Sequence, residues 1–182
     1  MLTIGQRVRD FRDLPAVDGA RYSLTDFARH RVLVVVFIST GCPTVKANED
    51  RLMALQGKYR KAGVGFVAIN ANNPYLSPPD TFEEMARRAD EKQFNFPYLK
   101  DTDGAVADHF GAVSTPHVFV LNASRHLVYK GRIDDKRDPS RATSSDLENA
   151  LRDVFADVPV KVPETQPFGC AIVRQWPVTG SV

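Results

Sequence analysis

The stretch VLVVVFISTGCPTVKANE, residues 32–49, decides the fold of this chain. It opens with Val32 to Ile38, an apolar and mostly β-branched run that predicts a strand buried on both faces of a sheet. An amphipathic pattern follows, and Pro43 suits the first position of a helix, because the N–H that proline lacks would have no partner there. Cys42 is therefore expected where a strand passes into the N-terminus of a helix.

The position of Cys42 favours ionisation of its thiol. Unpartnered backbone N–H groups and the helix dipole stabilise an anion at a helix N-terminus, and the anion of a cysteine is the thiolate. The alternative is that Cys42 is a small apolar residue at the end of a strand. A cysteine that only packs has no need of this position, so we predict that Cys42 is a reactive nucleophile.

The composition is that of an ordinary globular protein. The chain has 182 residues, 43% of them hydrophobic and 25% charged, and this length favours a single domain, residues 1–182. The formal net charge is +2, with basic and acidic residues interspersed, so nucleic-acid binding is not expected. The sequence also lacks a Gly-rich phosphate-binding loop, which leaves nucleotide binding without support.

Export and membrane insertion are not indicated either. The longest apolar run, Val32 to Ile38, is too short to cross a bilayer, and residues 1–14 lack the apolar core of a signal peptide. We therefore expect no membrane partner and a cytoplasmic location. The chain has two cysteines, Cys42 and Cys170. In a reducing compartment such a pair is more often catalytic or redox-active than structural.

Hydrophobic periodicity and turn residues predict an α/β sandwich with a central mixed β-sheet. The expected order is an N-terminal hairpin at 11–22, a helical turn at 23–27, strands at 32–38, 64–70, 117–121 and 126–133, a short strand within 94–100, and helices at 43–61, 80–93, 102–110 and 144–155. The C-terminal extension, residues 156–182, contains Phe168, Cys170, Ile172 and Trp176. Disordered tails seldom contain such residues, so we expect this tail to pack onto the domain.

Three parts of the chain resemble one superfamily. They are FISTGCPTVKANEDRL (37–52), HFGAVSTPHVFVLN (109–122), and the C-terminal pair LVYKGRIDD (127–135) and PFGCAIVRQW (167–176). These stretches are similar to the thioredoxin fold, and more closely to its redoxin branch of alkyl hydroperoxide reductase and thiol-specific antioxidant (peroxiredoxin-like) proteins. The resemblance implies a thioredoxin-like fold, in which helices flank a central mixed β-sheet, with an N-terminal hairpin and a packed C-terminal tail.

The resemblance also implies the residues of a site. Thr115 and Pro116 look like the Thr-Pro loop of the fold, in which the proline is cis. In that fold the loop lies opposite the active cysteine, and the backbone before the proline pairs with substrate. The substrate-binding residues would then be Ser39, Thr40, Gly41, Thr115 and Pro116.

Three positions depart from the family patterns. Ser39 stands where a related bacterial group has the first cysteine of Cys-x-x-Cys, so a dithiol cycle within the motif cannot form. The resulting Ser-x-x-Cys resembles the Thr-x-x-Cys of peroxiredoxins, so Ser39 either donates to a bound oxygen or only ends the strand. Val35 replaces a peroxiredoxin proline, and Pro116 takes the place of the arginine that binds peroxide.

The predicted activity is that of a thiol-dependent oxidoreductase of the redoxin type. Cys42 would attack a peroxide or a substrate disulfide and become a sulfenic acid or a mixed disulfide. Cys170 either resolves the oxidised Cys42 through an intramolecular disulfide or only helps the tail to pack. No cofactor is expected, and the electrons would come from an external thiol reductant similar to thioredoxin or glutathione.

Two alternatives stay open at this point. One is a monothiol disulfide oxidoreductase without peroxidase activity. The other is a redox-inactive thioredoxin-fold binding protein, which the replacement of a cysteine by Ser39 keeps open. No metal site is expected, because Ile38 stands where a related copper-chaperone branch has its first cysteine.

We predict structural rather than catalytic roles for four residues near the motifs. Lys46 and Glu49 are expected to form a solvated ion pair one turn apart on the helix. Arg132 is expected to pair with one of the two aspartates that follow it closely, in GRIDD. His117 follows the Thr-Pro loop and is expected to be a packed residue rather than part of the mechanism.

Overall fold

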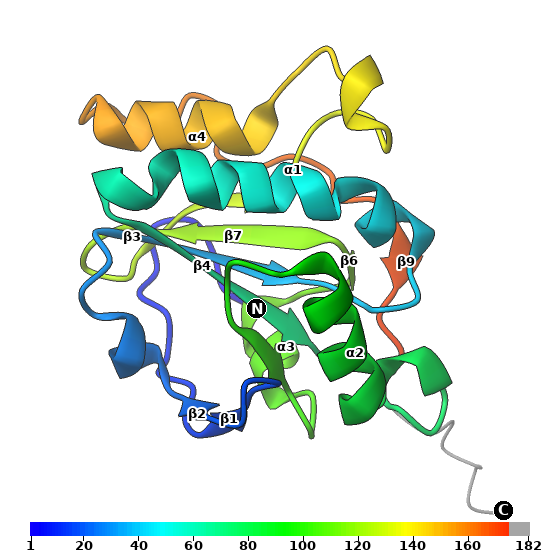
Figure 1. The fold of residues 1–182 in the computed structure, drawn as a ribbon. Coiled ribbons are helices and arrows are strands. Elements are labelled where there is room, and N and C mark those ends of the chain that lie inside the picture. The colour runs from blue at the N-terminus through cyan, green and yellow to red at the C-terminus, as the bar shows by residue number, and fades with distance from the viewer. Residues whose placement is uncertain (175–182) are drawn as a thin grey trace, which may run out of the picture.

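A five-stranded mixed sheet forms the centre of the computed structural model, which describes residues 1–174 (Figure 1). Its strands are β3 (Val32–Phe37), β4 (Val64–Asn70), β5 (Tyr98–Lys100), β7 (His117–Leu121) and β8 (Leu127–Gly131). They lie in the order β5–β4–β3–β7–β8, with β3 in the middle. The first three strands are parallel to one another, whereas β7 is antiparallel to both of its neighbours.

Helices and two small strand pairs surround this sheet. The α-helices are α1 (Pro43–Tyr59), α2 (Phe82–Lys92), α3 (Ala105–Phe110) and α4 (Asp146–Phe155). Short 3-10 turns are η1 (Leu24–Phe27), η2 (Arg60–Ala62), η3 (Pro78–Asp80) and η4 (Pro139–Arg141). The strand pairs are β1 (Leu14–Pro15) with β2 (Arg21–Tyr22), and β6 (Ser114–Thr115) with β9 (Cys170–Ala171). None of the helices in residues 1–174 is long and apolar enough to cross a membrane.

Alternate residues of β3 face two separate hydrophobic cores. Those of one set pack against α1 and α4, and they are Val32, Val34 and Val36. Those of the other set pack against α3 and the N-terminal segment, and they are Leu33, Val35 and Phe37. Figure 1 shows α1 and α4 on one side of the sheet and α3 on the other. The strand is therefore buried on both faces, as its apolar run predicts.

Helix α1 begins and ends as its sequence predicts. Cys42 is the N-cap residue, with an extended backbone, and Pro43 occupies the first turn. At the other end η2 continues α1 for one turn, and Gly63 stops it with a left-handed backbone (φ 95°). The chain then enters β4 parallel to β3, which completes the expected βαβ unit. The α/β sandwich and the order of its elements are confirmed.

The C-terminal extension packs onto the domain over residues 156–174. The N–H of Lys130 in β8 donates to the carbonyl of Pro163 at 3.0 Å, and the N–H of Thr165 donates back to the carbonyl of Lys130 at 3.1 Å. Further along, the tail crosses to β6 and forms β9 (Figure 1). Trp176, for which packing is also predicted, lies outside the described residues.

Two predicted ion pairs are wrong. Glu49 is buried and pairs with Arg88 of α2 at 2.6 Å, not with Lys46. Arg132 pairs with Asp146 in the first turn of α4 at 2.7 Å, not with an aspartate in its own loop. In both cases an element distant in sequence supplies a partner that is better placed than the nearest neighbour along the chain.

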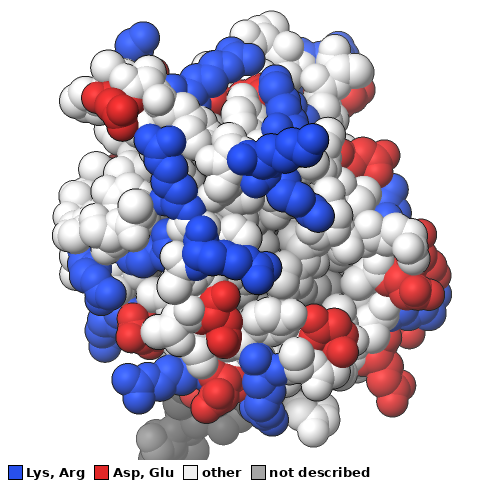
Figure 2. Space-filling model, turned by 60° about the vertical axis from the view of Figure 1, so that its left-hand side comes forward, with Lys and Arg blue, Asp and Glu red and all other residues white. Residues whose placement is uncertain are grey.

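The end of the sheet opposite Cys42 is rich in basic side chains (Figure 2). Lys58 lies in the last turn of α1, and η2 contributes Arg60 and Lys61; all three are exposed. A helix of 17 residues is about 25 Å long, so this basic face lies far from the N-terminus of α1.

Candidate active site

Cys42 and Cys170 lie against each other at the N-terminus of α1. Their Sγ atoms are 2.6 Å apart, and both residues are free thiols. Cys42 is buried, with 2% of its surface exposed, whereas Cys170 is half-buried. Because the sulfurs of a disulfide are about 2.0 Å apart, a small movement is enough to join this pair. The fold thus brings together two thiols that are 128 residues apart in the sequence.

Backbone pairing places Cys170 at this site. β9 is antiparallel to β6, in a register that sets Cys170 opposite Thr115, and the N–H of Ile172 donates to the carbonyl of Val113 at 3.2 Å. Gly169 precedes β9 with φ 142°, and a Cβ at this position would lie 2.0 Å from the carbonyl oxygen of Thr115. Glycine is therefore required for the tail to approach the loop this closely.

The peptide bond between Thr115 and Pro116 is cis, as the resemblance implies. The carbonyl oxygen of Thr115 accepts a hydrogen bond from the Cys42 thiol at 3.3 Å. Thr115 is 2% exposed, and within residues 1–174 its hydroxyl has no hydrogen-bond partner. The loop thus lies directly against the predicted nucleophile.

The two thiols differ in how readily they ionise. Burial opposes ionisation of Cys42, but hydrogen bonds from the Cys170 thiol and from the backbone N–H groups of Val45 and Cys170 favour the thiolate, and the pKa of Cys42 is lowered. Burial and the contact with Cys42 raise the pKa of Cys170 to about 11. The negative charge of the pair is therefore favoured on Cys42, at the helix N-terminus.

The loop before Cys42 is held by a buried carboxylate that the sequence analysis did not identify. Asp80 is fully buried and accepts hydrogen bonds from the backbone N–H of Thr40 at 2.7 Å and from the Ser39 hydroxyl at 3.4 Å. The hydroxyls of Thr40 and Tyr98 are 3.0 Å apart. Because both side chains are engaged in this interior network, a substrate-binding role for Ser39 and Thr40 stays a prediction.

The network around Asp80 keeps its carboxylate ionised. Burial opposes the charge, but hydrogen bonds from Ser77, Asn72, Asn70 and the N–H of Thr40 lower the pKa of Asp80. The Asn70 and Asn72 amides donate to it at 2.8 and 2.9 Å. The only local sign of this arrangement is the Asn- and Pro-rich composition of residues 71–80.

The same network reaches the C-terminal tail. The Lys100 ammonium donates to the carbonyls of Asn72 at 2.6 Å and of Asp80 at 3.0 Å, and burial lowers the pKa of Lys100 to about 8. The Asn72 side chain in turn accepts the N–H of Val173 at 2.8 Å. Buried polar contacts therefore connect the loop before Cys42 to the C-terminal tail that carries Cys170.

Gly41 is exposed at the edge of a groove of about 630 Å³ beside the site. Lys46 and charged residues of α2 line this groove. A Cβ at Gly41 would lie 3.0 Å from a side-chain atom of Pro79, so a larger residue would crowd the groove. The substrate-binding role of Gly41 and of Pro116 also stays a prediction. Within residues 1–174 no group of three or more His, Cys, Asp or Glu is arranged to hold a metal ion.

A mixed sheet, a thiol at the helix N-terminus after the central strand, and a facing cis-proline loop define a thiol protein with a thioredoxin-like fold. The chain belongs to the Redoxin family, whose model matches residues 3–151. The fold is shared with the thioredoxin domain of a thiol-disulfide oxidoreductase from Bacteroides vulgatus, at a TM-score of 0.60 and 16% identity over 71% of this chain and 89% of that one.

Two other proteins are more similar in sequence. A hypothetical protein from Sinorhizobium meliloti 1021 has a solved structure that is 34% identical, with a TM-score of 0.89, over 96% of both chains. The peroxiredoxin Bcp of Escherichia coli K12 is 32% identical over 98 residues, which are 54% of this chain. The match spans 58% of that relative's length.

Proposed function

We propose that this protein is a thiol peroxidase of the redoxin type, with Cys42 as the peroxidatic thiol and Cys170 as the resolving thiol. The observation that carries the proposal is the 2.6 Å contact between the two sulfurs at the N-terminus of α1. The pKa of Cys42 is lowered, whereas that of Cys170 is raised. A thiolate beside a neutral thiol suits the formation of a sulfenic acid and its subsequent removal.

In the first step, the Cys42 thiolate attacks one oxygen of a peroxide, ROOH. A bond forms between Sγ and that oxygen, the O–O bond breaks, and the leaving alkoxide takes a proton from solvent to become the alcohol ROH. Cys42 is oxidised to the sulfenic acid while the peroxide is reduced. The buried Thr115 hydroxyl, which has no partner within the described residues, would donate to the peroxide oxygen.

In the second step, the sulfur of Cys170 attacks Sγ of the oxidised Cys42. The S–S bond forms, the S–O bond breaks, and the hydroxide leaves as water with the proton of Cys170. An external thiol reductant, similar to thioredoxin or glutathione, then supplies two electrons. Its two thiols become a disulfide, and both cysteines of the protein return to thiols.

The burial of the site favours a small oxidant. Cys42 is 2% exposed, so hydrogen peroxide or a short alkyl hydroperoxide reaches it with less rearrangement than a protein disulfide does. We further infer a cytoplasmic location, in which the reductant keeps both thiols reduced. We also infer one domain, residues 1–182, with 156–182 as its C-terminal extension, because the described part of the extension carries Cys170 into the site.

Mass spectrometry of the thiols after treatment with one to two equivalents of hydrogen peroxide tests the proposal. The wild-type protein should form a Cys42–Cys170 disulfide. Cys170→Ser should instead accumulate sulfenic and then sulfinic acid on Cys42, because the resolving thiol is missing. Cys42→Ser should lose the peroxidase activity measured with an added dithiol, by more than about 1000-fold.

A second candidate is a monothiol disulfide oxidoreductase, which Pro116 favours because it replaces the peroxide-binding arginine of the family. If Cys42 stays reduced while glutathione in the same tube is oxidised, the peroxidase proposal fails. Formation of a mixed disulfide between Cys42 and added glutathione disulfide would then support the second candidate. No reaction with either oxidant would indicate a redox-inactive binding protein.

A further inference from the structure

The loop between β8 and α4, residues 134–143, carries a cation without an ion-pair partner near the N-terminal turns of α1. Arg137 is exposed, and it forms no ion pair with any carboxylate in residues 1–174. This is unusual because the loop itself contains three aspartates, Asp134, Asp135 and Asp138. Asp134 pairs with Arg51, while Asp135 and Asp138 accept hydrogen bonds within the loop, and none of the three forms an ion pair with Arg137.

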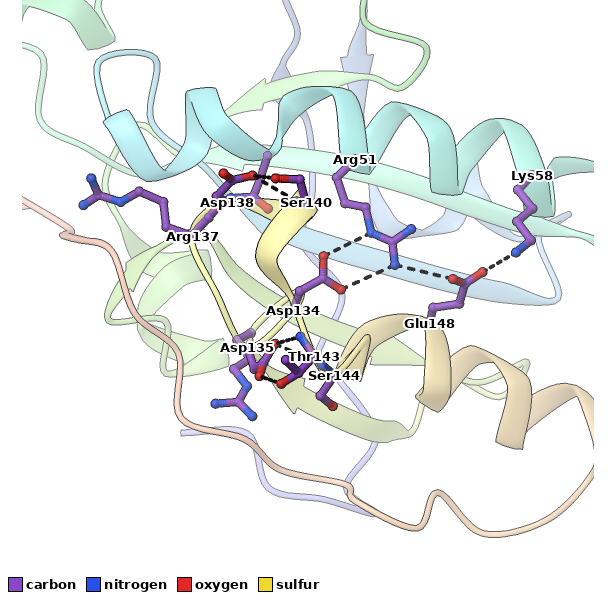
Figure 3. Close-up of polar contacts among 12 residues, drawn as sticks. Arg51, Lys58, Asp134, Asp135, Arg137, Asp138, Ser140, Thr143, Ser144 and Glu148 are labelled. Carbon is purple, nitrogen blue, oxygen red and sulfur yellow. Dashed lines mark hydrogen bonds and ion pairs between the residues drawn. The ribbon is translucent and has the colours of Figure 1, made fainter.

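Two of these aspartates fix the loop from within (Figure 3). Asp135 accepts hydrogen bonds from the N–H groups of Thr143 at 2.8 Å and Ser144 at 3.0 Å, which close the loop at its end. Asp138 accepts from the N–H and the hydroxyl of Ser140 at 2.9 and 2.7 Å, which caps η4. The backbone on both sides of Arg137 is therefore held in place.

The third aspartate fixes the loop to the rest of the domain. Asp134 is buried and accepts a hydrogen bond from Arg51 of α1 at 3.1 Å. Arg51 also contacts Glu148 of α4 at 3.4 Å, and Lys58 of α1 pairs with the same Glu148 at 2.7 Å. Figure 3 shows this chain of charges on one side of the loop, with the Arg137 side chain pointing away from it.

The backbone of Arg137 is bound to the first turns of α1. The buried Asn48 amide donates both to the carbonyl of Thr44 at 2.8 Å and to the carbonyl of Arg137 at 2.9 Å. A single nitrogen thus joins the loop to the helix turn that follows Cys42. Arg137 is therefore presented at the N-terminal end of α1, where Cys170 also lies.

The groups that face Cys170 come from three elements. From α1, Cys42 raises the pKa of Cys170 and the backbone N–H of Thr44 lowers it. From β6, Thr115 is uncharged and pairs with Cys170 through the backbone. From the loop, the charge of Arg137 favours ionisation of Cys170. Burial has the largest effect and opposes ionisation, so the thiol that has to act as resolving nucleophile is the less acidic one.

We propose that Arg137 stabilises the thiolate of Cys170 and thereby accelerates its attack on the oxidised Cys42. This role rests on the proposed function, and Arg137 acts through Cys170 without contacting the peroxide. A lone pair of the Cys170 thiolate forms the new S–S bond, the S–O bond of the sulfenic acid breaks, and the negative charge leaves on the hydroxide, which becomes water with the proton that Cys170 released. By stabilising the thiolate, Arg137 increases the fraction of Cys170 that is in its reactive form before the attack.

Alkylation of Cys170 in a Cys42→Ser background tests this effect directly, since Cys170 is then the sole thiol. The rate of reaction with iodoacetamide is measured from pH 7 to 11.5, because burial keeps the pKa of Cys170 raised. We expect Arg137→Ala to raise the pH midpoint by about half a unit, so that alkylation below the midpoint is about threefold slower. Arg137→Lys should restore the midpoint, because it keeps the charge.

Arg141→Ala is the matched control, because Arg141 is an exposed arginine of the same loop, within η4. Its midpoint should equal that of the parent protein. The difference between Arg137→Ala and the parent should also shrink in 1 M salt, which screens an exposed charge but would not correct a misfolded loop. Equal midpoints for Arg137→Ala and the parent, or equal losses in Arg137→Lys and Arg137→Ala, would overturn the inference.

The two-cysteine protein separates this inference from the proposed function. After a pulse of hydrogen peroxide, the disulfide should form about threefold more slowly in Arg137→Ala than in the wild type. Disulfide formation in the wild type with an unchanged rate in Arg137→Ala would overturn only the role of Arg137. A wild-type protein that forms no disulfide would overturn the proposed function, whereas a shifted alkylation midpoint would still establish the effect of Arg137 on Cys170.

Discussion

His117 follows the cis proline, yet its contacts are those of a core residue. Its Nδ1 accepts the N–H of Val113 at 3.3 Å, and its ring packs on Phe119 with ring centres 4.5 Å apart. Burial, with a smaller contribution from Lys130, lowers the pKa of His117 to about 4. The imidazole is therefore neutral at physiological pH, which agrees with its omission from the mechanism.

His117 should make the stability of the protein depend on pH. Between pH 6.5 and 4 the unfolded chain binds a proton at this histidine and the folded chain does not, so stability decreases as the pH falls. The loss should reach about 3 kcal/mol at most across this range. Urea unfolding at several pH values should show a smaller loss for His117→Gln than for the wild type. His126→Gln, which changes a histidine outside the core, should keep the wild-type pH dependence; equal slopes for all three proteins would contradict the assignment.

For single residues, the sequence predicts where a residue lies in the fold better than it predicts which other residues its side chain contacts. The placement of Cys42 follows from local rules for strands and helix starts, and the structure confirms it. The partner of Glu49 was predicted incorrectly, because the choice between Lys46 and Arg88 depends on how α2 packs against α1. The direction of the Ser39 hydroxyl depends in the same way on Asp80, which is 41 residues away.

Among the elements, β9 has the most specific consequence for the site. It has only two residues, and its pairing with β6 is supplemented by the bond between Asn72 and Val173 and by the ion pair between Arg174 and Asp108. A short edge strand with few apolar contacts separates readily from its neighbour. The position of Cys170 therefore depends on a small number of contacts at either end of β9.

Gly169→Ala should displace β9 and slow the resolving step. The added Cβ would collide with the carbonyl of Thr115, and φ 142° is unfavourable for alanine. We expect disulfide formation after a peroxide pulse to fall about tenfold, because the effective concentration of Cys170 at Cys42 decreases. Sulfinic acid on Cys42 should increase in parallel, as measured by mass spectrometry.

Gly57→Ala is the control for this experiment, because a Cβ at Gly57 meets no atom within 4 Å. It should leave the rate of disulfide formation unchanged. A wild-type rate in Gly169→Ala would show that the tail does not need its close approach to Thr115.

Most elements follow from the sequence because they depend on short patterns. The run from Val64 to Asn70 and the cap at Gly63 are examples, and the structure confirms both. The pairing of β9 with β6 does not follow from any local pattern, because a two-residue strand has no periodicity of its own. The apolar residues of the tail predict that it packs, but not on which strand.

In the whole molecule, one line of charges joins α1 to α4 on the same face of the sheet. Arg51 of α1 contacts both Asp134 of the loop and Glu148 of α4, and both carboxylates are buried. Removing the arginine would leave two buried negative charges with fewer partners. The line therefore fixes the arrangement of α1, α4 and the loop that carries Arg137.

Arg51→Ala should destabilise the protein by about 2–3 kcal/mol, because the buried Asp134 loses its ion-pair partner and the buried Glu148 loses one of its contacts. Chemical denaturation of the wild type and the variant measures this change in the free energy of unfolding. Arg87→Ala is the matched control: its ion pairs lie on the surface of α2, so its effect should stay within about 0.5 kcal/mol. Similar losses for the two variants would contradict the role given to the buried pairs.

The sequence alone does not predict how α1, α4 and the loop that carries Arg137 pack against one another. The strand order of the sheet agrees with the expected mixed α/β architecture. However, the pairing of Arg132 with Asp146, and the orientation that leaves Arg137 free, both depend on the final position of α4 against β8. These contacts form when segments that are far apart in the sequence pack together. Their distance along the chain does not predict whether they will meet.

If the proposed function holds, the pairing of β9 with β6 bears on which oxidants reach Cys42. The resemblance to the thioredoxin fold implies that the backbone before the cis proline pairs with substrate, but here Ser114 and Thr115 already pair with Ala171 and Cys170. The tail is thus an intramolecular competitor, tethered at a concentration that a separate polypeptide rarely matches. A peroxide needs no strand edge and is not excluded in this way. We therefore expect the chain to react more slowly with protein disulfides than with peroxides, without any residue that recognises either oxidant.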